Sequence, residues 1–217
     1  MDSTQPPRAD APVLGEPLPI ELMNTVWADR DGVHDALADA DGLARWLRAV
    51  RPRLEPRSGE AGTAGGWDPD EGAALAARYR RLRDALRRLA AAATDDDRPA
   101  AASPTPDVDA AVAVLNSACA DAPTWSHLTW PEGGAPSRTD RSARPRSVTA
   151  MSRIAEDAIR LFAGEQRAQL RACHAPGCVL YFLRTHPRRE WCSAACGNRA
   201  RVARHYQRHL AADRDTP

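Results

Sequence analysis

The pattern of apolar and polar residues along this chain predicts a protein built mainly from helices. The clearest segment is 69–93, where apolar side chains recur at intervals of four, three, four and three residues. They are Leu75, Tyr79, Leu82, Leu86 and Leu89. This spacing places them on one buried face of a helix, and we expect the intervening arginines to lie in water. Asp68, Pro69 and Glu71 provide the cap, the first helical residue and the capping-box partner.

Four shorter segments show the same helical period. The predicted helices span 20–27, 41–50, 105–119 and 147–162. The first is expected to turn Leu22, Val26 and Trp27 inward. The second is expected to begin at a cap provided by Asp39 or Asp41, and the last at a serine cap. The body of the protein is therefore predicted to be multihelical.

Strand signals are few and short. Residues 124–130, T-W-S-H-L-T-W, alternate and are β-prone, and 131–134 fit a turn after them. The other half of such a hairpin is poorly marked, because 135–146 is polar. A second strand is predicted at 179–183, V-L-Y-F-L, with 184–189 as a hairpin tip. These strands amount to small β elements beside the helices.

Polar segments without a period are expected to be loops or tails. They are the ends of the chain, a proline- and arginine-containing linker at 51–66, and a solvated loop around the acidic triplet 95–97. The 217 residues suffice for one moderate domain and a small module, and no apolar run approaches the length of a membrane span. All 30 basic residues other than histidine are arginines, which favours a GC-rich bacterial genome.

Four cysteines near the C-terminus carry the clearest chemistry. They form the pairs Cys173-x4-Cys178 and Cys192-x3-Cys196, with thirteen residues between the pairs. Two such pairs are typical of a tetrahedral zinc site, in which each sulfur lies about 2.3 Å from the ion. Buried free thiols and two disulfides are the alternatives, and disulfides are less favoured because no secretory signal is recognisable. We therefore expect one structural Zn²⁺ bound by all four cysteines.

The residues around these cysteines predict a small module organised by the ion. Pro176 and Gly177 allow a sharp turn within the first pair. Cys192 and Cys196 are four residues apart, on one face of the first turn of a helix whose positive N-terminus favours thiolates. The expected fold is a knuckle, a hairpin and a helix in a treble-clef-like arrangement, with the metal replacing a core too small to hold alone.

Three histidines are alternative ligands. His205 and His209 have ligand-like spacing, and His174 could replace a neighbouring cysteine in a three-cysteine, one-histidine site. Four cysteines already satisfy the ion, so the histidines are not expected to bind it. Asn198 and Arg199, directly after the last cysteine, are expected to orient the zinc turn through hydrogen bonds.

The net charge of +1 conceals an asymmetry along the chain. From residue 166 onward there are ten arginines and three acidic residues, giving +7, which leaves −6 for residues 1–165. A basic end on an acidic body favours a polyanionic partner. The candidate phosphate-contacting residues are Arg188, Arg189, Arg201, Arg204 and Arg208. The alternative is a solvated helix whose arginines pack along the module or pair with the acidic body.

The run W-C-S-A-A-C-G-N-R-A-R-V resembles the CGNR zinc finger, which is named for the tetrapeptide found here at 196–199. Upstream, P-L-P-I-E-L-M-N-T-V, D-G-L-A-R-W-L and V-L-N-S-A resemble, in the same order, the ABATE domain that usually precedes this finger. Two departures are Arg184 in a usually acidic place and Glu190 within a usually basic run. The resemblance implies a mostly helical body and a stress-induced transcription regulator.

Together these observations predict a mainly α (α+β) protein in two parts. The expected segments are a flexible tail at 1–16, an ABATE-like body at 17–165, a zinc finger with a basic helix at 166–210 and a tail at 211–217. The body is multihelical with a small β-hairpin element, and the finger is the treble-clef-like module.

Two functions fit these predictions. In the first, a cytoplasmic regulator contacts double-stranded DNA through the arginine-rich module, forms a homodimer, and senses a small ligand or protein partner with its body. In the second, the protein binds a partner or small ligand and its zinc module is purely structural. An enzyme is not expected, because no phosphate loop, H-E-x-x-H motif or nucleophile elbow occurs and four cysteines leave zinc no open position.

Overall fold

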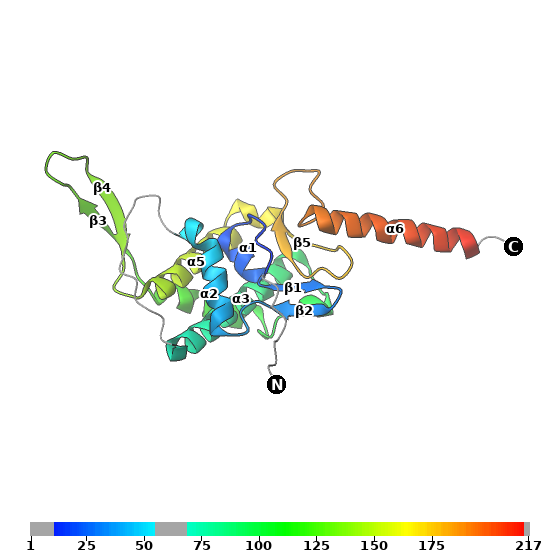
Figure 1. The fold of residues 1–217 in the computed structure, drawn as a ribbon, viewed down its shortest axis with the longest axis horizontal. Helices are drawn as coiled ribbons and strands as arrows, with labels where there is room; N and C mark the ends of the chain where they lie inside the picture. Colours follow the sequence, from blue (N-terminus) through cyan, green and yellow to red (C-terminus); the bar gives the residue numbers. More distant parts are fainter. Residues whose placement is uncertain (1–10, 55–68, 215–217) are drawn as a thin grey trace, which may run out of the picture.

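The computed structural model describes residues 11–54 and 69–214 and shows a helical body with small β elements (Figure 1). The helices are α1 (Leu18–Met23), α2 (Ala40–Leu54), α3 (Pro69–Thr94), α4 (Val108–Ala120), α5 (Arg146–Ala163) and α6 (Ala194–Arg214). Two 3-10 turns are η1 (Pro99–Ala101) and η2 (Glu165–Gln169). The strands are β1 (Val26–Asp29), β2 (Gly32–Asp35), β3 (Trp125–Thr129), β4 (Ser137–Arg141), β5 (Leu170–Ala172) and β6 (Tyr181–Leu183). They form three antiparallel pairs, β1–β2, β3–β4 and β5–β6, which confirms the predicted fold class.

Helix α3 is the centre of the body and contacts α1, α2, α4 and α5. Its side chains Tyr79, Leu82 and Leu86 are fully buried, which confirms the predicted apolar face. The expectation that the arginines between them lie in water is wrong for Arg83 and Arg87, which are only 4% and 2% exposed. Both guanidinium groups are held by partners on other elements, so the buried surface of α3 is wider than its apolar stripe.

Side-chain caps fix the starts of two predicted helices. Asp39 Oδ1 accepts a hydrogen bond from the Gly42 N–H at 2.8 Å, and Asp107 Oδ1 accepts one from the Ala110 N–H at 2.7 Å. These contacts satisfy N–H groups that a helix leaves unpaired at its beginning. Helices α2 and α4 therefore begin close to where the sequence predicts. Helix α5 begins after Pro145 rather than at the predicted serine cap.

The first predicted helix is shorter than expected. Helix α1 ends at Met23, and the Thr25 hydroxyl donates a hydrogen bond to the Leu22 carbonyl at 2.7 Å just beyond it. Val26 and Trp27, expected on the inner face of this helix, instead belong to β1. Both residue types favour strands, and the antiparallel pairing with β2 satisfies their backbone hydrogen bonds. The β1–β2 hairpin packs against the cysteine-containing module.

The predicted tails are also shorter than expected. The Glu21 carboxylate accepts hydrogen bonds from the N–H groups of Leu14 and Glu16 at 3.1 and 2.7 Å, so the segment before α1 is anchored. Helix α6 continues to Arg214, past the predicted boundary at 211. Residues 51–54 of the predicted linker belong to α2, which continues to Leu54 with Pro52 inside it, so this part of the linker prediction is wrong. The remaining predictions for the tails, the linker and the α3 cap lie outside the described residues: 1–10, 55–68 with Asp68, the side chain of Glu71, and 215–217.

Two elements project from opposite ends of the body: the β3–β4 hairpin and helix α6 (Figure 1). The register of the hairpin pairs Trp125 with Arg141 and Thr129 with Ser137. This pairing confirms the predicted strand at 124–130. It also identifies β4 as the partner strand, which the polar sequence at 135–146 did not indicate. Among the helices of the described residues, none has both the length and the apolarity that crossing a membrane requires.

Candidate metal centre

Strands β5 and β6 carry the first cysteine pair in the turn that joins them. The Cys173 N–H donates to the Leu180 carbonyl and the Cys178 N–H donates to the Ala175 carbonyl, both at 2.9 Å. Gly177 has a φ of +71°, a left-handed conformation that residues with a β-carbon rarely adopt. The predicted turn is therefore the knuckle that brings two sulfurs together.

The strand partner of 179–183 differs from the prediction. Strand β6 pairs with β5, which precedes it, and the turn of this hairpin is the knuckle itself. Residues 184–189, predicted as a hairpin tip, form a loop that leads to the second cysteine pair. Strand β5 escaped prediction because three residues are too few to show an alternating pattern.

The second pair lies at the start of α6. Cys192 precedes the helix and Cys196 lies in its first turn. Ser193 Oγ accepts a hydrogen bond from the Cys196 N–H at 3.3 Å, and the Ser193 carbonyl accepts one from the Gly197 N–H at 3.1 Å. A β-carbon at Gly197 would lie 3.1 Å from Cδ1 of Trp191, so glycine lets the helix start rest against the indole ring. The glycine of the C-G-N-R tetrapeptide thus has a packing role.

The four sulfurs converge on one point. All four Sγ atoms lie within 4.8 Å of one another, and the side chains of Cys173, Cys178, Cys192 and Cys196 are buried. The Sγ atom of Cys192 lies 3.9 Å from that of Cys178 and 3.4 Å from that of Cys196. A tetrahedral zinc with bonds of about 2.3 Å requires sulfurs about 3.8 Å apart. The number, type and spacing of the donors therefore fit a closed structural zinc site.

Hydrogen bonds favour negative charge on two of these sulfurs. The pKa of Cys196 is lowered by the neighbouring thiols of Cys173, Cys178 and Cys192. The pKa of Cys173 is lowered to about 7, mainly by the thiol of Cys178. Arg199 Nη2 donates to the Cys196 sulfur at 3.0 Å, and this bond raises the pKa of Arg199 despite the opposing effect of burial. The thiol of Cys173 is the main cause that raises the pKa of Cys178 and of Cys192. Zinc binds the thiolate form, so binding releases protons from these two cysteines.

Arg98 joins the body to the backbone of the first cysteine pair. Its Nη1 donates to the carbonyls of Cys173 and Cys178, both at 2.6 Å. Asp96 holds the guanidinium through bonds of 2.6 and 2.7 Å and accepts the Tyr181 hydroxyl at 2.7 Å. Burial acts to raise the pKa of Asp96, but these hydrogen bonds outweigh it and lower the pKa. The acidic triplet is therefore not a fully solvated loop, because the Asp96 side chain is only 1% exposed.

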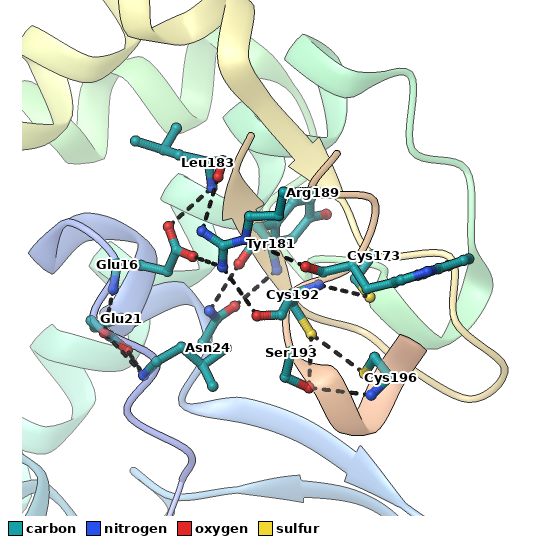
Figure 2. Close-up of polar contacts among 12 residues, drawn as sticks. Glu16, Glu21, Asn24, Cys173, Tyr181, Leu183, Arg189, Cys192, Ser193 and Cys196 are labelled. Atoms are coloured by element: carbon teal, nitrogen blue, oxygen red, sulfur yellow. Dashed lines mark hydrogen bonds and ion pairs between the residues drawn. The ribbon is translucent and has the colours of Figure 1, made fainter. Parts of the chain in front are cut away.

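Asn24 pairs with β6 in the way that a neighbouring strand would (Figure 2). Its Oδ1 accepts the Tyr181 N–H at 2.9 Å, and its Nδ2 donates to the Tyr181 carbonyl at 3.0 Å. Arg87 lies close by and donates to the carbonyls of Met23 and Val179 at 3.1 and 3.2 Å and to a carbonyl of η1. Burial lowers the pKa of Arg87. These two side chains tie α1 and α3 to the zinc knuckle.

Glu16 and Arg189 form a third link, also drawn in Figure 2. Glu16 accepts the Leu183 N–H at 3.0 Å and pairs with the Arg189 guanidinium. Arg189 also donates to the carbonyls of Leu183 and Cys192, at 3.1 and 3.0 Å, and its guanidinium lies 5.0 Å from the centre of the Phe182 ring. This arrangement disfavours the predicted phosphate contact of Arg189, because Glu16 already neutralises its charge.

The structure places the other predicted residues as follows. Arg188, Arg201, Arg204 and Arg208 are exposed, as are His174 and His205, while the side chain of His209 lies outside the described residues. Arg199 contacts a zinc ligand directly. Asn198 Oδ1 instead accepts a hydrogen bond from Arg201, on the outer side of α6.

Sequence reasoning missed the groups by which the body holds the knuckle: Glu16, Asn24, Arg87 and Arg98. Asn24 lies in one of the segments that resemble the ABATE domain, and this resemblance is the only feature of the sequence that could have indicated its role. The two arginines gave no signal, because their burial depends on carbonyls contributed by distant parts of the chain.

The fold and the site define a two-part zinc protein, in which a helical body holds a four-cysteine finger. Residues 16–165 match the ABATE family, described as "Putative stress-induced transcription regulator", and residues 169–209 match the CGNR zinc finger. The first match covers more than half of the chain, so this protein belongs to the ABATE family and carries a C-terminal CGNR finger. No curated protein matches the chain. The finger holds one structural zinc, bound by Cys173, Cys178, Cys192 and Cys196.

Proposed function

We propose that this protein is a transcription regulator that contacts double-stranded DNA through α6, with the zinc ion positioning the start of that helix. The uncovered outer half of α6 carries the proposal. All side chains from 201 to 208 are exposed except the half-buried Ala203. No aspartate or glutamate occurs between residues 191 and 212. A polyanion is the partner that such a surface favours.

The spacing of the exposed arginines supports this proposal. Arg201, Arg204 and Arg208 are three and four residues apart, so they share one side of the helix. The major groove of DNA is about 12 Å wide and admits an α-helix. Helix α6 points away from the body, which leaves its outer half open to a duplex (Figure 1). The three guanidinium groups then neutralise phosphates along the groove.

A cavity in the body supports a sensing role. It measures about 330 Å³ and lies between β2 and α2, with His34, Asp39, Arg45 and Trp46 among its lining. This size lies at the lower end of the range for small-molecule sites. The Trp27 ring stacks on His34 at 4.4 Å and packs against the cysteine cluster. A small ligand in the cavity would therefore act on the zinc finger through these two rings.

We further propose that the protein is not an enzyme and acts in the cytoplasm. Four sulfur ligands leave the zinc without the open position that a catalytic ion needs. A site of four thiolates requires reduced cysteines, which the cytosol maintains.

A second candidate function is favoured by the links between body and finger. Asn24, Arg98 and Glu16 hold the knuckle so closely that the zinc would serve as a staple within one folded unit. In this case the cavity or another surface of the body binds the ligand or partner, and α6 contacts no DNA.

Fluorescence polarisation with a labelled DNA duplex separates the two candidates. The full chain, loaded with one zinc, is titrated over a series of salt concentrations. The regulator is expected to bind at low salt, with an affinity that falls steadily as salt rises. Arg201→Ala, Arg204→Ala and Arg208→Ala are each expected to reduce the slope of log affinity against log salt by about one.

The matched control is Arg30→Ala, whose side chain is 93% exposed on the β1–β2 turn, and it is expected to leave both affinity and slope unchanged. Absence of binding at low salt by the folded, zinc-loaded chain refutes the DNA proposal and supports the second candidate. An equal loss of affinity in Arg30→Ala also refutes it, because binding would then reflect total charge rather than α6.

A further inference from the structure

The β3–β4 hairpin gathers three large exposed apolar side chains within six residues of the chain. Trp125, Leu128 and Trp130 are 51%, 63% and 71% exposed. The hairpin stands away from the body at the end opposite to α6 (Figure 1). Exposed apolar patches of this kind mark interaction surfaces, and tryptophan is enriched where such surfaces contribute most to binding.

The register of the hairpin defines its outer face. Leu128 lies opposite Arg138, and the next pair on the same face is Ser126 with Asp140. Trp130 follows Leu128 by two residues, directly after β3, and the two-residue alternation of a strand assigns it to the same face. The other face carries Thr139, which is only 8% exposed, and Trp125, which is 51% exposed at the base of the hairpin. We call the face formed by Ser126, Leu128, Trp130, Arg138 and Asp140 the Leu128 face.

The charges of the Leu128 face balance within the face itself. Arg138 Nη2 lies 3.4 Å from Asp140 Oδ1, so the face combines two large apolar side chains with one internal ion pair. A two-fold contact places the same surface against itself, so a face with a strong excess of one charge would meet like charges there. The outer half of α6 has such an excess in Arg201, Arg204 and Arg208, whereas the Leu128 face does not.

We propose that the Leu128 face is the contact between two copies of this chain. Leu128 and Trp130 of each copy pack against the hairpin of the other copy, and the Arg138–Asp140 pairs exchange partners across the contact. A two-stranded hairpin is marginally stable alone in water, so a second hairpin also stabilises the arm. A nucleic acid is not the partner, because this face has no excess of positive charge.

Sedimentation equilibrium of the full chain over a range of concentrations tests this proposal. The wild type is expected to reach twice the monomer mass of 23.6 kDa at micromolar concentration. Leu128→Asp and Trp130→Asp are each expected to weaken dimerisation by about thirtyfold, the effect of a central contact residue. Both side chains are exposed, so the variants are expected to keep the fold and the bound zinc.

The matched control is Val112→Glu on α4, where the valine is 41% exposed, and it is expected to leave dimerisation unchanged. Hydrogen exchange gives a second measurement without substitution: the amides of β3 and β4 are expected to exchange more slowly as concentration rises. A wild type that stays monomeric, a dimer that persists in both variants, or hairpin exchange independent of concentration overturns the proposal. None of these outcomes bears on α6 and DNA, which the hairpin variants leave intact.

Discussion

The two sides of the zinc finger use arginine in opposite ways. On the inner side, Arg87, Arg98 and Arg189 donate to carbonyls and carboxylates of the body and the finger, and Arg98 and Arg189 are also paired with carboxylates. On the outer side, Arg201, Arg204 and Arg208 are exposed on a helix that leaves the body. The difference shows that a count of positive charge does not identify a binding surface, because the fold decides which arginines a partner can reach.

The two sides are also expected to respond differently to substitution. Removing an inner side chain leaves buried polar partners without hydrogen bonds, at a cost of about 1–3 kcal/mol for each neutral group. Removing an outer side chain changes the free energy of unfolding by less than about 0.5 kcal/mol. Inner variants should therefore alter stability and zinc affinity, and outer variants should alter only the binding of a partner.

The largest effect is expected from loss of a zinc ligand. Binding of a structural zinc contributes about 10–16 kcal/mol in finger peptides, which is folding free energy for the module. We expect Cys178→Ser to lose the zinc and the amide protection of β5 and β6, while α3 stays protected. Zinc content and hydrogen exchange measure both changes. Cys119→Ser, at a half-buried cysteine outside the site, should retain one zinc, and unchanged zinc affinity in Cys178→Ser would contradict the assignment.

A smaller effect is expected from Arg98→Ala. The substitution leaves the Asp96 carboxylate buried without its charge partner and frees the carbonyls of Cys173 and Cys178. We expect a loss of about 3 kcal/mol in the free energy of unfolding. Zinc affinity is expected to fall at least about tenfold, the usual effect of losing a group that supports metal ligands.

Arg80→Ala is the matched control for this inner contact. Arg80 also donates to two carbonyls, those of Leu37 and Ala38 at 2.7 and 3.2 Å, but these lie away from the zinc. It should lower stability and leave zinc affinity unchanged, as measured by competition with a chelator. Equal losses of zinc affinity in both variants would show that Arg98 acts through general stability alone.

The smallest effect is expected in the pH dependence of stability that comes from Glu21. Burial raises the pKa of Glu21 above its ordinary value of 4.5, although the N–H groups of Leu14 and Glu16 and the charge of Arg53 act against it. The folded state therefore holds this proton to a higher pH than the unfolded state does. Glu21 accordingly lowers stability as pH rises from about 4.5 through its folded pKa.

Urea unfolding at several pH values, with zinc in excess, compares the wild type with Glu21→Gln. The stability of the wild type relative to the variant should decline by less than about 1 kcal/mol across this range. An increase with pH would mean that the N–H groups and Arg53 dominate over burial.

The helical faces and the metal site were predictable because each depends on local spacing. Tyr79, Leu82 and Leu86 recur with the helical period, and the four cysteines have the separations that a tetrahedral ion requires. Strand β4 was not predictable, because it is exposed over most of its length and keeps a polar sequence. Such a strand shows neither an apolar run nor an alternation.

The links between body and finger were not predictable for a different reason. An arginine within a helix looks solvated in sequence, and Arg87 is buried only because carbonyls from α1, η1 and the knuckle surround it. Asn24 and Tyr181 are 157 residues apart, a distance over which no local pattern can connect them. The sequence therefore predicted both parts of the protein but not the contact between them.

The separation of Asn24 from Tyr181 has a consequence for the order of events during synthesis. Asn24 leaves the ribosome long before its partner strand exists, and translation adds about 5–20 residues each second. The side-chain amide of Asn24 therefore lacks its partner for about 8–30 seconds after it is synthesised. Zinc binding and the docking of Asn24 on β6 are therefore both late events. A nascent chain without zinc would expose the surface around Asn24 to chaperones and proteases.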